Sequence, residues 1–159
     1  MKKGYIFRIS KYLFQISWGK NEAFDEAITH ESNDEIKYYI LFKRHFFAKN
    51  YDECYYDVIE AYRKSCLHWD SLETFLNSVL PLMIEDKRYE IAEKMIKGIL
   101  ENNIPLNKAN KENAYHALVI AIYYQGRYAE LKELIEFMEA DSMLMDHKII
   151  SWYRENAKE

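Results

Sequence analysis

The stretch QGRYAELKELIEFME, residues 125–139, decides the fold, because two earlier stretches repeat its pattern. These are KNYDECYYDVIEAYRKS at residues 49–65 and DKRYEIAEKMIKGIL at residues 86–100. The turn tyrosines of the three stretches, Tyr51, Tyr89 and Tyr128, lie 38 and 39 residues apart (89 − 51 and 128 − 89). Self-similarity at a period of this length is typical of stacked helical units.

Apolar residues recur at matching distances from each tyrosine, with spacings of three and four that place them on one helical stripe. Before the tyrosines stand Tyr38, Leu41 and His45; Leu76, Val79 and Met83; Tyr115, Leu118 and Ile122. After them stand Cys54, Val58 and Ala61; Ala92, Ile96 and Ile99; Leu131, Ile135 and Met138. Only His45 is neither apolar nor aromatic. Each unit is therefore predicted to be a helix, a tight turn ending at the tyrosine, and a second helix, and such pairs become stable by stacking.

These units predict an all-α chain that forms a single helical-repeat domain over residues 1–159. The expected repeat units are 34–66, 71–105 and 109–143, with N-terminal capping helices over 3–30 and a C-terminal helix over 143–156. Capping boxes are expected at Ser32 with Glu35 and at Asp70 with Glu73, and Asp141 or Ser142 is expected to cap the last helix. Pro81 is expected to bend the helix that contains it, because proline removes a backbone hydrogen bond.

The third unit, NAYHALVIAIYYQGRYAELKELIEFMEADS at residues 113–142, resembles the tetratricopeptide repeat in its run of aromatic, leucine, alanine, tyrosine, Gln-Gly and a turn tyrosine. The sequence departs from that family where Phe42, Leu80 and Val119 replace a small residue of the first helix, and where Leu131 replaces one of the second. The period is longer than the family's and approaches that of HEAT-type repeats. The resemblance implies a right-handed α–α superhelix, a TPR-like or HEAT-like solenoid of three to four helix pairs with flanking N- and C-terminal helices.

The resemblance also implies a binding surface, because partners of that family lie on the inner face formed by the first helix of each unit. The matching positions are Ile36, Tyr39, Lys43 and Phe46, then Thr74, Asn77, Pro81 and Ile84, then Asn113, His116, Ile120 and Tyr123. They lie off the packing stripes yet include aliphatic and aromatic groups, which mark partner sites when exposed. The alternative is that Phe46 and Ile120 pack between repeats.

The charge distribution favours a protein partner. The chain carries 22 basic and 26 acidic residues, a net charge of −4. Residues 1–20 hold five basic side chains and no acid, so the remainder has 17 − 26 = −9. An acidic remainder argues against direct nucleic-acid binding and suits a basic protein. The basic first helix has an apolar stripe of Tyr5, Ile9, Tyr12 and Ile16, so we favour a capping role over contact with a membrane surface.

The sequence contains few residues or motifs that are typical of catalysis or metal binding. Two cysteines, Cys54 and Cys66, leave a disulfide open but favour a reduced, cytoplasmic protein. Cys66, His68 and Asp70 are metal-capable but lack a second ligand pair at zinc spacing, so no metal or cofactor is predicted. The sequence has no Gly-rich phosphate loop, G-x-S-x-G elbow or H-E-x-x-H pair. We expect a non-enzyme, with an active site assembled across repeats as the alternative.

The resulting hypothesis is a non-catalytic protein–protein interaction module. In the favoured version it is a dedicated inhibitor of the toxin-immunity type, which neutralises a cognate protein such as a basic toxin or nuclease. In the alternative it is an adaptor, chaperone or peptide-sensing regulator that uses the repeat groove reversibly. No sequence motif separates these two versions, and the identity of a co-purifying partner would.

Overall fold

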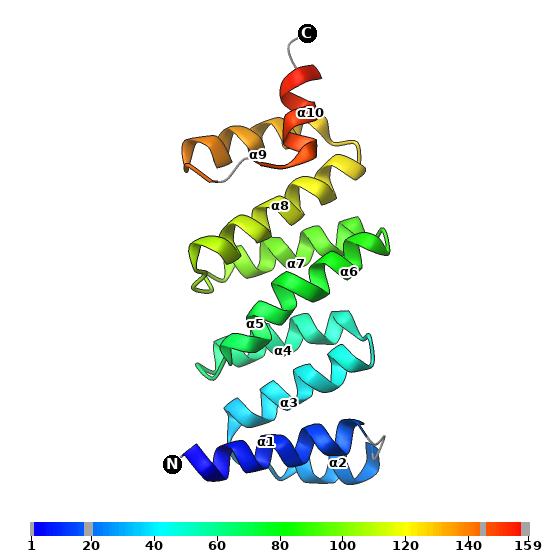
Figure 1. The fold of residues 1–159 in the computed structure, drawn as a ribbon, viewed down its shortest axis with the longest axis vertical. Helices are drawn as coiled ribbons and strands as arrows, with labels where there is room; N and C mark the ends of the chain where they lie inside the picture. The colour runs from blue at the N-terminus through cyan, green and yellow to red at the C-terminus, as the bar shows by residue number, and fades with distance from the viewer. Residues whose placement is uncertain (1, 18–20, 144–145, 157–159) are drawn as a thin grey trace. The chain divides into compact units, whose positions relative to one another are not determined.

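The computed structural model describes residues 2–17, 21–143 and 146–156, which form helices and contain no strand (Figure 1). The all-α prediction is confirmed for this part of the chain. The chain divides into two compact units, Met1–Phe75 and Leu76–Glu159. The division falls inside the second predicted repeat, and the single-domain organisation stays a prediction.

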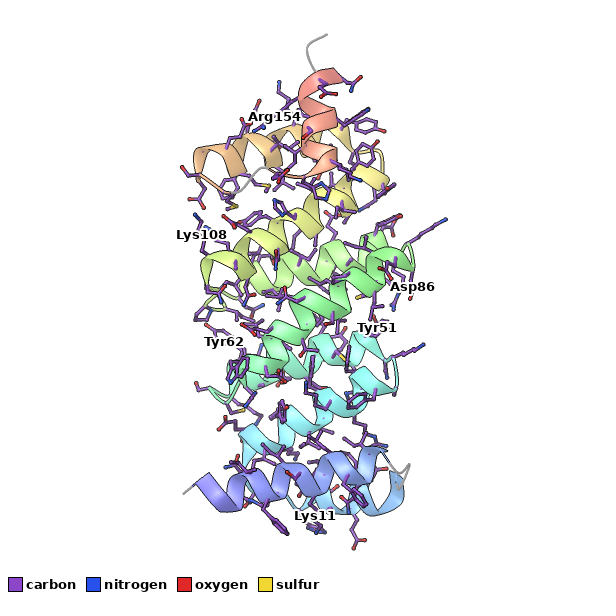
Figure 2. All side chains as sticks on the ribbon, in the orientation of Figure 1. Lys11, Tyr51, Tyr62, Asp86, Lys108 and Arg154 are labelled. Atoms are coloured by element: carbon purple, nitrogen blue, oxygen red, sulfur yellow. The ribbon has the colours of Figure 1, made fainter. Side chains whose placement is uncertain are left out.

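Five α-helices lie in the described part of the first unit. They are α1 (Lys2–Ser17), α2 (Asn21–Thr29), α3 (Asp34–Phe47), α4 (Tyr51–Arg63) and α5 (Trp69–Thr74). Helix α1 packs on α2 and α3, while α3 also packs on α4 and α5. Tyr51, labelled in Figure 2, is the first residue of α4, as the turn pattern predicts.

A turn of π-helix, η1 (Phe75–Val79), follows α5 and leads into α6. The other helices of the second unit complete the element order. They are α6 (Leu80–Glu85), α7 (Tyr89–Glu101), α8 (Lys108–Tyr124), α9 (Tyr128–Ala140) and α10 (Lys148–Asn156). Helix α8 packs on α6, α7, α9 and α10. The π-turn ends two residues before Pro81, and an irregular turn there accommodates a residue that has no backbone N–H.

The predicted second-helix stripes form the core. All of the stripe positions on α4, α7 and α9 are buried, from Cys54 in the first unit to Met138 in the second. On the first helices the agreement is partial, since Tyr38, Leu41, His45 and Tyr115 are only half-buried. The polar exception, His45, places Nδ1 2.7 Å from Oδ2 of the buried Asp57 and so joins α3 to α4.

The N-terminal helices cover one face of α3. Tyr12, Phe24, Ile28, Ile36 and Ile40 form a buried cluster. Glu31 reinforces it by accepting hydrogen bonds from the Tyr12 hydroxyl at 3.0 Å and from Arg8 at 2.9 Å. The stripe expected on the first helix therefore faces protein, although its Tyr5 side chain lies outside the described residues. No helix in the described part of the chain is long and apolar enough to span a membrane.

Several expected helix starts are wrong by one or more residues. Asn33, rather than Ser32, caps α3 and accepts from the Ile36 N–H at 2.9 Å. His68, rather than Asp70, caps α5. The last helix begins at Lys148 instead of residue 143. In each case another side chain with a suitable acceptor lies nearer to the first helical turn.

The helix–helix turns share one backbone form. The helices α3, α4, α6, α7, α8 and α9 are each followed by a residue with positive φ, namely Lys49, Ser65, Lys87, Asn103, Gly126 and Ser142. After α8, the Gly126 N–H donates to Tyr123 O and the Arg127 N–H donates to Ile122 O. This pair of bonds is the Schellman arrangement, which satisfies the last carbonyls of a helix. Only at Gly126, where φ is 71°, does glycine remove the steric cost of this conformation.

We therefore predict opposite effects for the same substitution at two glycines. Gly126→Ala adds a Cβ at positive φ and is expected to destabilise the protein by about 1–2 kcal/mol. Gly4→Ala lies inside α1, where an added Cβ meets nothing within 4 Å, and is expected to stabilise by roughly 0.5–1 kcal/mol. Urea unfolding of both variants measures the difference, and equal effects would contradict the turn geometry.

Candidate functional site

A groove of about 540 Å³ runs along the second unit between the helical segment Leu76–Glu85 and α8. It is lined by Leu76, Asn77, Pro81, Ile84, Glu85, Asn113, His116, Ala117 and Ile120. The residues recur at helical spacings of three and four on each side, so each helix presents one face to the groove. The structure thus brings together Asn77, Pro81 and Ile84 with Asn113, His116 and Ile120, all of which the sequence had placed on one binding face.

The groove has an apolar floor and mixed walls. Leu76 and Ala117 are buried at its base. Ile84, Ile120 and His116 are half-buried along it, so each keeps part of its side chain open to a ligand. Concave sites that combine apolar surface with a few oriented polar groups are typical of peptide and ligand binding.

Three asparagine side chains supply an ordered polar row. Asn113 donates from Nδ2 to Asn77 Oδ1 at 2.8 Å, and Asn77 donates from Nδ2 to Asn110 Oδ1 at 3.5 Å. Asn110 is buried and its Oδ1 belongs to this row, whereas Asn77 and Asn113 are exposed. The two exposed amides have hydrogen-bonding capacity beyond these bonds, which suits the N–H and C=O groups of an extended peptide backbone.

His116 connects the groove to the start of α10. Its ring lies 5.6 Å from the ring of His147, centroid to centroid. His147 Nδ1 accepts from the Ile149 N–H at 3.2 Å and so caps α10. Burial lowers the pKa of His147 below its ordinary value of 6.5, and the electrostatic effect of the neighbouring His116 lowers it further, although Asp146 acts in the opposite direction.

The first-unit residues of the predicted binding face have a different environment. Ile36 is fully buried in the cluster with Tyr12 and Phe24, so its assignment to an exposed binding face is wrong. The physical reason is that α1 and α2 cover this side of α3. The resemblance assigns that side to a binding groove, because it matches the inner face of the first helix in the family.

Tyr39, Lys43 and Phe46 are half-buried and already make contacts within the unit. Lys43 Nζ lies 2.6 Å from Asp70 Oδ2 and 5.3 Å from the centre of the Tyr39 ring. The Tyr39 ring packs 4.4 Å from that of His68. Phe46 stacks in parallel on Phe42, a buried residue of the same helix. This contact lies within α3, so the alternative that Phe46 packs between repeats stays a prediction.

His68 and Asp70 serve structural roles at the start of α5. The His68 Nδ1 accepts from the Asp70 N–H at 3.3 Å, and burial lowers the pKa of His68. Cys66, the third member of the metal-capable sequence cluster, is a free thiol, as is Cys54. Burial raises the pKa of Cys54 to about 12, so this thiol is held in its protonated form. Among the described residues, no group of three or more His, Cys, Asp and Glu side chains is arranged to hold a metal ion.

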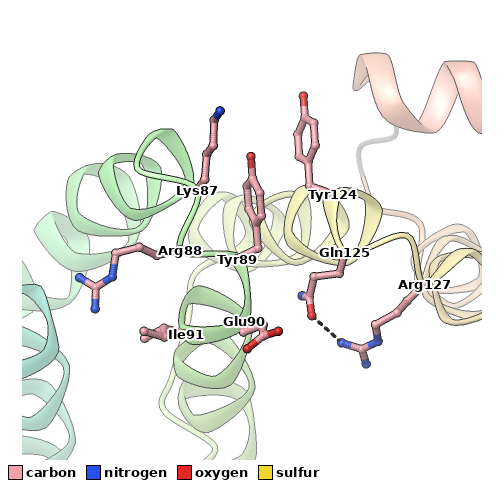
Figure 3. A pocket seen from close by; sticks show the side chains of 8 residues that line it. All are labelled: Lys87, Arg88, Tyr89, Glu90, Ile91, Tyr124, Gln125 and Arg127. Atoms are coloured by element: carbon pink, nitrogen blue, oxygen red, sulfur yellow. Dashed lines mark hydrogen bonds between the residues drawn. The ribbon is translucent and has the colours of Figure 1, made fainter.

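A second pocket, the turn pocket, lies at the other end of α8 and has a volume of about 550 Å³ (Figure 3). It is lined by Lys87, Arg88, Tyr89, Glu90, Ile91, Tyr124, Gln125 and Arg127. The rings of Tyr89 and Tyr124 stand side by side in Figure 3, with centroids 5.0 Å apart and planes 12° from parallel. The sequence identified Tyr89 only as the residue that marks a turn. Its contact with Tyr124 could not be predicted from local spacing, because Tyr124 belongs to the next repeat.

Glu93 binds two residues that line the turn pocket, Gln125 and Arg127. Its buried carboxylate accepts from Lys97 at 2.5 Å, Gln125 at 2.8 Å and Arg127 at 2.5 Å. Burial alone would raise the pKa of Glu93, but these three hydrogen bonds outweigh burial and keep the pKa below its ordinary value. The carboxylate therefore stays charged and joins α7 to the α8–α9 turn.

Tyr123, the last residue of the predicted face, does not line the groove. Its ring contacts Tyr124, Tyr128 and Trp152 instead. The groove residues that sequence reasoning missed are Leu76, Glu85 and Ala117. Leu76 was assigned to the packing stripe, and Ala117 has no chemical signal beyond its spacing four residues after Asn113.

Comparison with protein-family models, with curated proteins and with solved structures finds no match for the chain.

We predict that His147 makes the protein less stable in mild acid. Because the folded-state pKa lies below 6.5, the unfolded chain binds a proton more readily than the folded protein. The contribution of neutral His147 to the free energy of unfolding is fully present above about pH 6.5 and is lost as pH falls through the folded-state pKa. His147→Asn keeps a capping acceptor but cannot titrate. Urea midpoints at pH 7.5 and 5.5 should differ less for this variant than for the parent, and an unchanged difference would contradict the assignment.

Proposed function

We propose that this chain is a non-catalytic protein-binding module and that a partner polypeptide docks in the groove between Leu76–Glu85 and α8. The observation that carries the proposal is the convergence in one concave site of apolar side chains, such as Ile84 and Ile120, with the amide row of Asn77 and Asn113. The apolar residues offer contacts for partner side chains. The amides offer hydrogen bonds to the partner's backbone.

Within this class, we favour a dedicated inhibitor that neutralises a cognate basic protein in the manner of an immunity protein. The support is electrostatic, since the chain has a net charge of −4 and its acidic excess lies beyond the first 20 residues. Opposite charge accelerates the encounter of two proteins, which benefits an inhibitor that must act before its target does. A cytoplasmic location accords with the free thiols of Cys54 and Cys66.

The amide row favours a second candidate, a regulator or adaptor that binds extended peptides reversibly. Side-chain amides recognise backbone groups and so tolerate different partner sequences. The two candidates differ in what co-purifies with the full chain from its native cells. A single basic protein supports the inhibitor, whereas short peptides or several client proteins support the adaptor.

We also propose that the helix pairs are degenerate tetratricopeptide-like repeats wound in a right-handed superhelix. The support is the shared unit, in which α4, α7 and α9 each begin at the repeated tyrosine after the same type of turn. Small-angle X-ray scattering of the full chain tests this arrangement, because a superhelix is more elongated than a compact domain of the same length.

The proposed groove predicts that two isoleucine substitutions have different effects on partner binding. Ile120→Ala is expected to weaken partner binding by about 1–2 kcal/mol, because it removes apolar contact area from the groove wall. Ile91→Ala is the matched control, since Ile91 is 39% exposed in the same unit and lines the turn pocket instead of the groove. Calorimetric titration of the purified partner measures both affinities. Equal affinities for the two variants would place the partner elsewhere.

A basic partner also predicts salt-dependent association. The association rate is expected to fall about tenfold or more between low and physiological ionic strength, while the dissociation rate changes less. Stopped-flow mixing at two salt concentrations measures both rates. An association rate that does not depend on salt would remove the electrostatic support for the inhibitor.

A further inference from the structure

Aromatic side chains gather on the surface where α8, α9 and α10 meet. Tyr123 lies 5.3 Å from Trp152 and 6.0 Å from Tyr128, and Tyr128 lies 6.3 Å from Trp152, between ring centroids. Tyr128 is 52% exposed and Trp152 is 42% exposed. These rings therefore form a solvent-facing group and do not belong to the core.

The group encloses a pocket of about 210 Å³, lined by Tyr128, Trp152, Tyr153 and Asn156. We call it the aromatic pocket. The planes of Tyr128 and Trp152 are tilted by 42°, so the rings diverge and do not cover each other's faces. Tyr123 meets Trp152 at 75°, edge to face, and helps to fix the direction of the indole. A ligand in this pocket would meet electron-rich ring faces whose orientation is already set.

The amide of Asn156 offers the aromatic pocket a hydrogen-bond acceptor. Asn156 donates from Nδ2 to the Trp152 carbonyl oxygen at 2.7 Å. A carbonyl oxygen accepts only, so this bond fixes the orientation of the amide. Asn156 Oδ1 is then the amide atom that can receive a hydrogen bond from a ligand, and it selects a donor.

The surrounding charges also favour a cation. From Arg127 to Asn156 the chain carries four basic and seven acidic residues, 4 − 7 = −3. The two arginines of this segment are already paired, since Arg127 contacts Glu93 and Glu130 and Arg154 contacts Glu139. Because both guanidinium groups are engaged in these ion pairs, we do not expect either of them to occupy the ring faces of the aromatic pocket.

We propose that the aromatic pocket binds the guanidinium group of an arginine side chain on a partner protein. The inference deepens the proposed function and rests on it, because it supplies a second contact for a basic partner. Aromatic faces attract cations through their quadrupole. Arginine suits the site better than lysine, because a planar guanidinium stacks on a ring while its edge donates to an acceptor such as Asn156 Oδ1.

The test uses two small probes that have the same shape and differ in charge. Acetyl-arginine methylamide is titrated into the full chain, followed by the NMR signals of the tryptophan indole N–H groups. Acetyl-citrulline methylamide, whose urea group is neutral, is the matched probe. We expect the arginine probe to shift the Trp152 signal with a Kd on the order of 10 mM and the citrulline probe to bind about fivefold or more weakly. The signal missing from the Trp152→Ala spectrum assigns the indole.

Two further variants separate the site from a folding effect. Asn156→Ala removes the acceptor but no ring, and is expected to weaken the arginine probe about threefold. Trp69→Ala removes a different exposed tryptophan and is expected to leave binding unchanged, because Trp69 is not among the residues that line the aromatic pocket. Loss of binding in Trp69→Ala would overturn the assignment of the site.

Three other results would also overturn the proposal. They are equal affinity for the arginine and citrulline probes, a silent Trp152 signal, and tighter binding of tetramethylammonium than of the arginine probe. The last result would make the pocket a site for quaternary ammonium ligands. None of these results bears on the groove, because the effect of Ile120→Ala on partner binding is measured independently. Conversely, a partner unaffected by Ile120→Ala would leave the response of Trp152 to arginine intact.

Discussion

The second unit depends on the burial of α8 on nearly all sides. Most helices in the chain bury one apolar stripe, but α8 packs on α6, α7, α9 and α10. Three of its alanines, Ala114, Ala117 and Ala121, are buried and leave room for neighbouring helices to approach closely. Leu118 and Ile122 fill the remaining space on their own sides. Asn113, His116 and Ile120 stay at least partly open along one side of α8 and form a wall of the groove, and Tyr123 near the C-terminal end of α8 joins the aromatic group.

Besides the apolar packing of α8, the buried carboxylate of Glu93 determines the conformation of the α8–α9 turn. Glu93 is buried, and an unpaired carboxylate at this position would be costly. Its hydrogen bonds from Gln125 and Arg127 require the residues on both sides of Gly126 to point back towards α7. The positive φ of Gly126 permits that reversal without a steric clash. Backbone conformation and charge pairing therefore agree on one geometry for this turn, and that geometry places Tyr128 beside Tyr123.

The sequence was sufficient for those features that depend on local periodicity. The starts of α4, α7 and α9 at Tyr51, Tyr89 and Tyr128, and the burial of their stripes, follow from spacings of three and four. The face of α8 that carries Asn113, His116 and Ile120 was predicted from the resemblance to the tetratricopeptide repeat, which places partners on the first helix of each unit. The burial of Ile36 could not be predicted in this way, because it depends on contacts with α1 and α2, which lie outside the repeat. Trp152 was missed because α10 follows the last unit and its ring partners are distant in the sequence.

The two candidate surfaces of the second unit differ in the kind of recognition that each can provide. The groove combines aliphatic side chains with amides, and neither group distinguishes strongly among partner sequences. The aromatic pocket combines ring faces with hydrogen-bond acceptors, among them Asn156 Oδ1, and we expect it to discriminate by charge and by planar shape. A partner that occupied both would gain contact area from the first and selectivity from the second. Because α8 supplies one wall of the groove and also the tyrosine that orients Trp152, the burial that fixes α8 fixes both surfaces in one unit.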